Sequence, residues 1–339
     1  MKQKVIITGG TGFIGSHTAV EFIQNGFEVV LVDNLCNSDI SVVDRIEKIT
    51  GIKPEFEDLD LTDNKKSHSF FNKHKDAKGV INFAALKAVG ESVQKPIEYY
   101  RNNLNILLNV LECMEVNAIP NFIFSSSATV YGLPDKLPIT EESETQRPTS
   151  PYGNTKKIGE EIIEDFVKVS TNVKAISLRY FNPIGAHNSG LLGEAPSGVP
   201  NNLMPYIVQV AAGVRKELKV FGKDYNTKDG TAIRDYIHVM DLAVAHLAAF
   251  NRLNKDLKNE KLEIFNLGTG IGYSVLDVIS SFEKTSRQKV NYSFDDRREG
   301  DVPQLYADSS KANKKLEWST TLSLDDMTRS SWKWQESLN

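Results

Sequence analysis

The 339-residue sequence has only two cysteines, Cys36 and Cys113, and neither lies in a Cys-x-x-Cys arrangement. Two such cysteines cannot build a disulfide framework. The six histidines show no metal-ligand spacing and no His-Glu-x-x-His motif, so we expect no metal site. No apolar run approaches the ~18 residues that a transmembrane helix requires. The expectation is therefore a globular chain without structural disulfides, metal or membrane spans.

An excess of charge of one sign is also missing, because 40 Lys and Arg stand against 44 Asp and Glu, a net charge of −4. This balance gives no electrostatic footprint for nucleic acid or an anionic membrane, so we expect neither as a partner. A hydrophobic content of 40% is that of a globular protein with a substantial core. The first residues run into a strand-like segment without a signal-peptide core, so a reducing, cytoplasmic location is expected.

A glycine-rich turn follows the first predicted strand. Residues 4–8 form a β-branched run, the turn spans residues 9–15, and a helical pattern continues to about Asn25. A second strand over residues 28–32 ends at Asp33, 18 positions beyond Gly15. This order is typical of dinucleotide-binding units, in which the glycines and the helix N-terminus receive the pyrophosphate. Asp33 stands where a carboxylate binds the ribose 2′-hydroxyl, and its charge favours NAD over NADP.

Strands and helices go on alternating through the first half of the chain. Further strands are predicted near residues 55–58, 79–83 and 121–125, with helices over 62–73 and 96–117. Such alternation predicts an α/β fold with a Rossmann-type, doubly wound parallel sheet, whose ligands bind at the carboxyl ends of the strands. Four candidate side chains fall at such ends: Asp33, Asp60, Phe83 and Ser127.

The next predicted helix carries the residues that point to proton-transfer chemistry. Pro151 suits its first turn and Ser150 its cap, so Tyr152 and Lys156 share one helical face. An ammonium beside a phenol lowers the phenol pKa, which favours an acid/base catalyst. The alternatives are an ordinary surface Tyr/Lys pair, and for Ser127 a turn serine that bonds its own backbone. Because Ser127 has no Gly-x-Ser-x-Gly context, we do not expect it to be a hydrolase nucleophile.

The glycine turn, Ser127 and the Tyr152/Lys156 pair together resemble the extended short-chain dehydrogenase/reductase family. Within it, the chain is similar to the UDP-glucose 4-epimerases from residue 4 to about 334. The similar stretches are residues 8–18, 33–38, 86–100, 121–132, 179–183, 200–205, 234–241 and 297–301.

The resemblance implies catalytic roles for Ser127, Tyr152 and Lys156, with NAD as cofactor. It implies NAD contacts at Gly9, Gly12, Phe13, Ile14, Gly15, Asp33, Asn34, Leu35, Cys36, Asn37, Ser38, Asp60, Leu61, Phe83, Ala84, Ala85, Lys87, Asn102, Tyr152, Lys156 and Tyr180. It implies contacts with a UDP-sugar at Lys87, Ser127, Tyr152, Phe181, Asn182, Asn202, Leu203, Val220, Phe221, Arg234, Arg298, Asp301 and Leu305.

The second half of the chain reads as a smaller mixed α/β substrate lobe. We expect an NAD-binding domain over 1–180, with segments near 236–268 returning to it, and a discontinuous UDP-sugar lobe over 181–339. Arg234 and Arg298 suit a diphosphate because the planar guanidinium gives paired charge-assisted hydrogen bonds. The alternative for them is a surface salt bridge with Asp235 or Glu299. The family also implies a homodimer through the helices over 96–117 and 151–169.

The activity implied is interconversion of UDP-galactose and UDP-glucose without net oxidation. Tyr152 as phenolate takes the proton of the sugar 4-hydroxyl while a hydride passes to NAD⁺; the 4-keto sugar then turns over and the hydride returns to its other face. Leu305 is intermediate in size, so an N-acetylated UDP-sugar remains an alternative substrate.

Two other functions are weighed against the epimerase. A 4,6-dehydratase needs an acid pair just after Ser127, where this sequence has Ala128 and Thr129. A silent NAD-binding regulator predicts loss of the catalytic residues, and all three are present.

Overall fold

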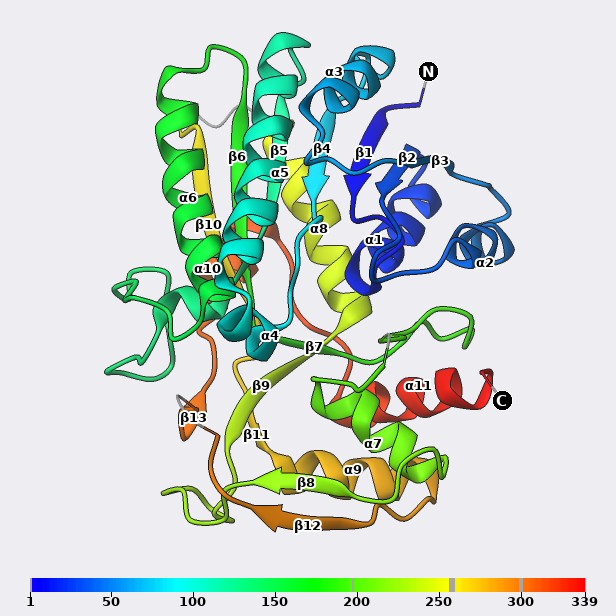
Figure 1. Cartoon of the computed structure of the whole chain (residues 1–339), viewed down its shortest axis with the longest axis vertical. Coiled ribbons are helices and arrows are strands. Elements are labelled where there is room, and N and C mark those ends of the chain that lie inside the picture. Colours follow the sequence, from blue (N-terminus) through cyan, green and yellow to red (C-terminus); the bar gives the residue numbers. More distant parts are fainter. Residues whose placement is uncertain (1, 197, 256–259, 299–300, 339) are drawn as a thin grey trace. The chain divides into compact units, whose positions relative to one another are not determined.

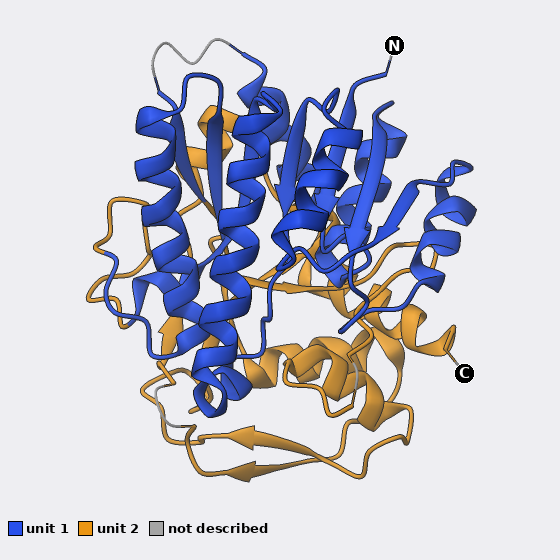
Figure 2. Cartoon of the chain, turned by 45° about the horizontal axis from the view of Figure 1, so that its top comes forward, with its two compact units in different colours: residues 1–132, 145–179, 243–265 blue, residues 133–144, 180–242, 266–339 orange. Residues whose placement is uncertain are grey.

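The computed structural model describes residues 2–196, 198–255, 260–298 and 301–338. The chain divides into two compact units that each draw on separate stretches of sequence (Figure 2). Unit 1 comprises residues 1–132, 145–179 and 243–265, and unit 2 comprises residues 133–144, 180–242 and 266–339. None of the helices in the described ranges has the length and apolar character that crossing a membrane requires.

A seven-stranded sheet forms the centre of unit 1 (Figure 1), in the order β10-β6-β5-β4-β1-β2-β3. Its pairs β1–β2, β1–β4, β2–β3 and β4–β5 run parallel. The strands are β1 (Lys4–Thr8), β2 (Glu28–Asp33), β3 (Glu55–Asp58), β4 (Gly79–Asn82), β5 (Asn121–Ser127), β6 (Lys174–Tyr180) and β10 (Leu262–Leu267). The predicted Rossmann-type α/β fold is confirmed.

Helices cover both faces of this sheet. They are α1 (Phe13–Gln24), α2 (Ser41–Thr50), α3 (Asn64–Lys73), α4 (Val89–Gln94), α5 (Pro96–Val116), the 3₁₀ turn η1 (Ala128–Tyr131), α6 (Pro151–Val169) and α8 (Val239–Leu253). The apolar sides of α3, α5 and α6 form one buried cluster with the sheet. On α1 and α8, the rings of Phe22 and Phe250 meet edge to face at 5.6 Å.

The strand order reverses between β4 and β1, in the middle of the sheet. From β1 the chain first builds β2 and β3 on one side and then β4, β5 and β6 on the other. The helices that follow β1 and β4 therefore leave a crevice at the carboxyl ends of these strands. Asp33 ends β2, Phe83 follows β4 and Ser127 ends β5, so three of the four predicted residues lie at strand ends on this edge.

Unit 2 contains two small sheets and its own core. One sheet has the order β11-β9-β13 with β7 also paired to β9, and the other pairs β12 with β8. The strands are β7 (Asn182–Ile184), β8 (Leu218–Phe221), β9 (Ile233–His238), β11 (Gly272–Ser274), β12 (Tyr292–Asp295) and β13 (Gln304–Leu305). The helices are α7 (Leu203–Ala211), α9 (Val275–Ser286), α10 (Ser310–Leu316) and α11 (Leu324–Glu336). Apolar residues of α7, α9 and α11 form the core with the strands.

The unit boundaries differ from the sequence-based expectation in two places. Residues 133–144 belong to unit 2, because Ile139 forms a bridge with Ala307 and its N–H donates to the Tyr306 carbonyl oxygen at 3.0 Å. The segment that returns to unit 1 is 243–265 rather than 236–268, because β9 pairs with strands of unit 2.

Candidate active site

The glycine turn between β1 and α1 is closed too tightly for side chains. The N–H of Gly9 donates to the Val32 carbonyl oxygen at 2.8 Å, and a Cβ on Gly15 would overlap the Gly9 carbonyl oxygen. Gly12 caps α1 without any side-chain hydrogen bond, so no side chain competes for the first N–H groups of the helix. Phe13 and Ile14 open that helix. A helix N-terminus of this kind fits a pyrophosphate, through its N–H groups and its dipole.

Asp33 organises the loop beside this turn. One carboxylate oxygen accepts from the Thr11 N–H at 3.2 Å; the other accepts from the Leu35 N–H at 3.0 Å and the Ser38 hydroxyl at 3.2 Å. Leu35 holds the left-handed conformation, with φ of 57°. Asn34, Cys36 and Asn37 are exposed on the same loop. The half-buried carboxylate can accept a hydrogen bond from a ribose hydroxyl, so this loop fits the adenosine end of NAD.

The segment after β4 is clamped to α6 by Asn103, a residue of α5. The Asn103 amide accepts from the Leu86 N–H at 2.8 Å and donates to its carbonyl oxygen at 3.0 Å and to the Thr155 hydroxyl at 3.1 Å. Asn102 donates to the Asn103 side-chain oxygen at 3.0 Å. Phe83, Ala84, Ala85 and Lys87 all lie on the clamped segment. Asn103 is therefore a structural support of the predicted cofactor site.

Asp60 and Leu61 follow β3. Asp60 is exposed and accepts from the Thr62 N–H at 2.9 Å, whereas Leu61 is buried.

Ser127, Tyr152 and Lys156 come together at the end of β5 and the start of α6. The Ser150 hydroxyl caps α6 by accepting from the Gly153 N–H at 3.2 Å, and Pro151 occupies its first turn. The Ser127 hydroxyl accepts from the Thr129 N–H at 3.2 Å and lies near enough to the Tyr152 phenol to lower its pKa. The Lys156 ammonium nitrogen lies 5.8 Å from the centre of the Tyr152 ring. Sequence therefore predicted which three side chains meet.

The pKa values of the pair differ from the expectation that Lys156 lowers that of the phenol. Burial raises the pKa of Tyr152 to about 12, although the Ser127 hydroxyl opposes the shift. Burial also lowers the pKa of Lys156 to about 8. Taking either group out of water disfavours its charged form, and in the protein alone this effect outweighs the attraction between ammonium and phenolate.

In unit 2, several predicted substrate residues lie around Arg234 of β9. Arg234 forms an ion pair with Asp301, and it donates to the Ile233 carbonyl oxygen at 2.8 Å. Leu305 is the register partner of Arg234 in the neighbouring strand β13. The Arg298 guanidinium stacks 4.1 Å above the ring of Phe221. These residues form a positively charged, partly aromatic surface that fits a nucleoside diphosphate.

The salt bridge proposed as an alternative for Arg234 is wrong. Asp235 points elsewhere: it is fully buried and accepts from the N–H groups of Thr269, Gly270 and Ala307. Burial is the largest influence on this carboxyl and raises its pKa. Glu299, the alternative partner of Arg298, lies outside the described residues.

The remaining predicted substrate residues are spread over unit 2. Asn182 lies in β7, and Asn202 precedes α7 and donates to Glu194 at 2.7 Å. Leu203 starts α7, and Phe181 and Val220 are buried. Tyr180, predicted to contact NAD, is buried as well. Among the described residues, no group of three or more His, Cys, Asp or Glu side chains could hold a metal ion.

Comparison with known proteins assigns the chain to a family. The family model described as GDP-mannose 4,6 dehydratase matches residues 6–331. The UDP-glucose 4-epimerase of Drosophila melanogaster is 50% identical over 337 residues, covering 98% of this chain and 96% of that protein. The enzyme of the same name from Haemophilus influenzae is 49% identical over 332 residues, with 98% and 97% covered. The chain belongs to the UDP-glucose 4-epimerase family.

Solved structures of this family have the same fold. UDP-glucose 4-epimerase from Stenotrophomonas maltophila, with bound NAD and formylated UDP-arabinopyranose, aligns with a TM-score of 0.95 at 45% identity, covering 99% of this chain and 98% of that one. The Bifidobacterium longum enzyme in complex with NAD⁺ and UDP aligns with a TM-score of 0.94 at 47% identity, with the same coverage.

The sequence analysis missed a buried polar network beside the predicted catalytic side chains. Glu160 of α6 forms a bidentate ion pair with Arg179 of β6 and also accepts from Ser126. One signal was available, because Glu160 lies four residues beyond Lys156 and so on the same helical face. Arg179, one of the buried residues of β6, gave no indication of its partner.

Proposed function

We propose that this chain is an NAD-dependent UDP-glucose 4-epimerase that interconverts UDP-galactose and UDP-glucose. The observation that carries the proposal is that Ser127 and Lys156 both lie beside Tyr152, with the Lys156 ammonium nitrogen 5.8 Å from the centre of its ring. Full-length similarity to curated enzymes of this name supports the same activity.

NAD, when bound, supplies the acceptor that takes a hydride from the sugar and gives it back. The glycine turn and the N-terminus of α1 would hold its pyrophosphate, and Asp33 its adenosine ribose. Asp33 would repel a 2′-phosphate, because it already carries negative charge. Lys156 would bind the second ribose with its ammonium group. Lys87 and the other residues clamped by Asn103 would line the same side of the cofactor.

Tyr152 moves the proton in this proposal. Its hydroxyl oxygen, once ionised, takes the proton of the sugar 4-hydroxyl and later returns it. Ser127 donates a hydrogen bond that orients the reacting oxygen. Since burial raises the pKa of Tyr152, ionisation near neutral pH requires positive charge close to the phenol, and Lys156 contributes that charge.

Unit 2 binds the UDP group. Arg234 and Arg298 meet the diphosphate with charge-assisted hydrogen bonds, and the ring of Phe221 keeps the Arg298 guanidinium flat. The nucleotide site is completed by Phe181, Asn182, Asn202, Leu203, Val220 and Asp301. The nucleotide would be bound firmly and the sugar loosely, so that the 4-keto intermediate can present either face to the cofactor.

Leu305 makes a second substrate class worth testing. It is half-buried in β13 beside Arg234, where its side chain would limit the room for a group on the sugar C2. A side chain of intermediate size would admit an N-acetylated UDP-sugar poorly. The dehydratase alternative is less suited, because Ala128 and Thr129 carry no acidic group.

A coupled assay of the purified protein tests the function. UDP-galactose is expected to yield UDP-glucose without added NAD, and denaturation is expected to release NAD detectable by mass spectrometry. Parallel assays with UDP-N-acetylglucosamine measure the second substrate class. A purified protein that neither contains nor binds the dinucleotide would contradict the proposal.

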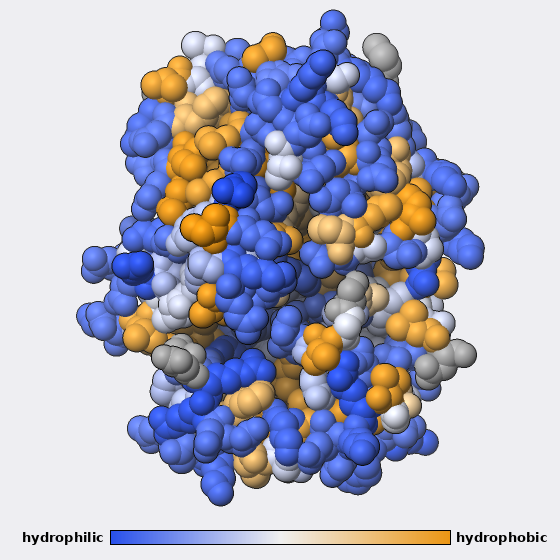
Figure 3. Space-filling view, viewed as in Figure 1, coloured by the Kyte–Doolittle hydropathy of each residue, from blue (hydrophilic) through white to orange (hydrophobic). Residues whose placement is uncertain are grey.

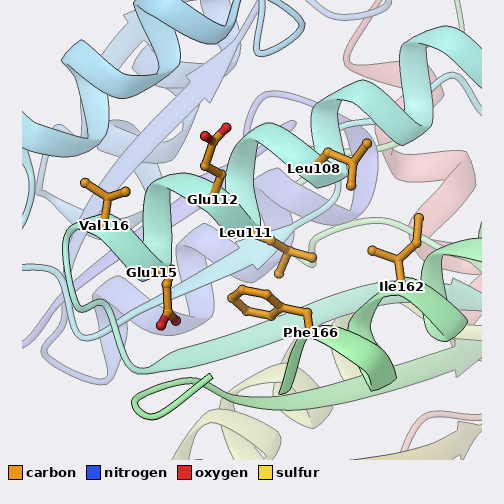
Figure 4. Close-up of a pocket in the computed structure, with 7 residues that line it drawn as sticks. All are labelled: Leu108, Leu111, Glu112, Glu115, Val116, Ile162 and Phe166. Carbon is orange, nitrogen blue, oxygen red and sulfur yellow. The ribbon is translucent and has the colours of Figure 1, made fainter. Parts of the chain in front are cut away.

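We infer that two copies pair through the face formed by α5 and α6. Hydrophobic residues gather over these helices in Figure 3, and Figure 4 shows Leu111 and Phe166 pointing toward one another in a groove there. Leu108, Val116, Glu112, Glu115 and Ile162 complete its lining. Leu108 and Val116 are 48% and 68% exposed, and burying such a patch is what an isologous dimer does.

The cytoplasm is the proposed location. Cys36 and Cys113 are both free, which is compatible with a reducing compartment.

A further inference from the structure

Glu160 sits at the centre of a buried hydrogen-bonded cluster in unit 1. Its carboxylate oxygens accept from the Arg179 Nε at 2.9 Å and from the Arg179 terminal nitrogen at 2.6 Å. The Ser126 hydroxyl donates to the same carboxylate at 2.5 Å. Arg179 also donates to the Tyr131 hydroxyl at 2.8 Å and stacks 4.8 Å from the centre of that ring. All four residues are at most 7% exposed.

Each member of this cluster is tied to an element that carries or adjoins a catalytic side chain. Ser126 immediately precedes Ser127 in β5, and Tyr131 closes the 3₁₀ turn that Ser127 caps. Glu160 follows Lys156 by one turn of α6, and Tyr152 by two turns. Side chains at these spacings share a helical face, so any rotation of α6 at Glu160 would also move Tyr152.

The packing around the cluster leaves α6 little freedom to shift. Gly159 has no Cβ, and one built there would lie 2.7 Å from the Phe124 ring of β5. The Lys156 ammonium nitrogen rests 5.0 Å from the centre of the same ring. Helix α6 and strand β5 are therefore in direct contact. The bidentate Arg179–Glu160 pair ties α6 to the neighbouring strand β6 in one orientation, because a fork-to-fork contact accepts only one, and the Ser126 hydroxyl ties the same carboxylate to β5.

Stability alone does not account for such a pair. Two buried charges lose so much hydration that an apolar pair of the same volume is often as stable or more stable. The ion pair also has no net charge with which to stabilise the phenolate. Its contribution is to fix the geometry of the elements it joins.

We propose that Glu160 and Arg179 are positioning residues, which hold α6 against β5 and β6 at the rotation that keeps the Tyr152 phenol beside Ser127. The proposal rests on the proposed function, because Ser127 is taken to orient the reacting oxygen. It adds residues that touch neither cofactor nor substrate but act through Ser127 and Tyr152.

The main test replaces both charges together, so that no unpaired charge stays buried. In the holoenzyme, the double variant Glu160→Met/Arg179→Met is expected to lower kcat for UDP-galactose by about 10- to 100-fold, because small misplacements of a reacting group cost that much. KM is expected to change by less than about 3-fold, since the UDP-binding residues are untouched. The matched control is Arg252→Met/Glu263→Met, which removes another bidentate pair of unit 1, between α8 and β10. Its kcat is expected to stay within about 2-fold of wild type.

Combination with Ser127→Ala separates positioning from general damage. If the pair acts through Ser127, adding the double substitution to Ser127→Ala costs little further activity, because residues acting as one unit are non-additive. Multiplication of the two separate losses would overturn the proposal, as would a kcat within about 2-fold of wild type in the double variant. Should the double variant fail to fold, Ser126→Ala removes one donor to Glu160 and is expected to show a smaller, equally non-additive loss.

A structural readout keeps the inference separate from the proposed function. Wild-type protein without epimerase turnover would refute the function alone. In crystals of the double variant with NAD, a longer distance between the Tyr152 and Ser127 hydroxyl oxygens than in wild-type crystals supports the positioning role whatever the activity. An unchanged distance overturns that role.

Discussion

At the scale of single residues, the proposed function makes the hydroxyl oxygen of Tyr152 the atom that carries the proton. Tyr152→Phe removes that oxygen and keeps the ring, so kcat is expected to fall by at least about 1,000-fold while bound NAD is retained. Ser127→Ala is expected to lose about 10- to 100-fold, because the phenol stays but the hydroxyl that lowers its pKa is gone. Coupled turnover assays and nucleotide content after denaturation measure both effects. A Tyr152→Phe variant with a tenth of wild-type activity would exclude the phenol as the proton carrier.

The pH dependence of activity follows from the same residue. Burial raises the pKa of Tyr152, and the reaction needs its ionised form, so kcat is expected to rise with pH through the pKa that the phenol has in the complete enzyme. Ser127 stabilises the phenolate, so Ser127→Ala is expected to move this rise to higher pH. A kcat that is independent of pH between 5 and 9 in both proteins would contradict this assignment.

Lys156 is expected to destabilise the protein that holds it. Burial lowers its folded-state pKa to about 8, from the ordinary lysine value of 10.5, so the unfolded chain binds the proton more strongly. The free energy of unfolding therefore rises with pH across the interval between these two values. In cofactor-stripped protein at pH 7, Lys156→Met is expected to gain up to about 3 kcal/mol, the equivalent of this pKa difference. The gain is expected to vanish above pH 10.5, where both states are uncharged.

Calorimetry of the two proteins from pH 6 to pH 11 checks this expectation. The melting temperature of Lys156→Met is expected to exceed that of wild type at the acid end and to converge with it at the alkaline end. A difference that does not change with pH would mean that packing, not the buried charge, separates the two proteins.

At the scale of elements, the contact between α6 and β5 depends on Gly159. Gly159→Ala would place a methyl group 2.7 Å from the Phe124 ring, so α6 must shift although alanine is the better helix former. The expected result is a loss of about 1–3 kcal/mol in unfolding free energy, together with lower kcat. Gly90→Ala in α4 is the control, because nothing lies within 4 Å of the added Cβ. Chemical denaturation and turnover assays compare the two, and equal effects would argue against a close contact at Gly159.

The exposed groove between α5 and α6 makes a prediction about assembly. Leu108→Asp places a charge in the apolar lining near Glu112 and Glu115, so it is expected to convert a dimer into a monomer. Val214→Asp, at a residue of unit 2 that is 63% exposed, is expected to leave the dimer intact. Light scattering coupled to size-exclusion chromatography measures both masses. A wild-type monomer, or a dimer that persists in Leu108→Asp, would contradict the proposed face.

For the molecule as a whole, unit 1 is not contained in the first 180 residues. Without residues 243–265 it lacks β10, which pairs with β6, and Phe250 of α8, which packs on Phe22 and Phe27. A fragment of residues 1–180 is therefore expected to bind no NAD and to melt without cooperativity. The same fragment joined by a flexible linker to residues 243–265 is expected to recover both properties. Cooperative melting of the shorter fragment would contradict this.

The sequence predicted those features whose signal lies within a short stretch of the chain. The sheet and the glycine turn were predictable because strand and helix periods repeat within a few residues and the fingerprint spans only residues 9–33. The clamp by Asn103 and the Arg179–Glu160 pair were not, because they join residues from separate elements. The pairing of Ile139 with Ala307 carries no periodic signal at all. The direction in which the pKa of Tyr152 shifts depends on burial, which only the folded chain determines.

The polypeptide passes between the two units five times, at residues 132, 144, 179, 242 and 265. A single genetic crossover cannot exchange one complete unit for that of a relative, since no single cut separates the whole of unit 1 from the whole of unit 2. New specificities on this scaffold are therefore expected to arise by individual substitutions, at positions such as Leu305, rather than by shuffling of modules. Because the two units are interleaved along the chain, substrate specificity in this family is expected to change by one substitution at a time.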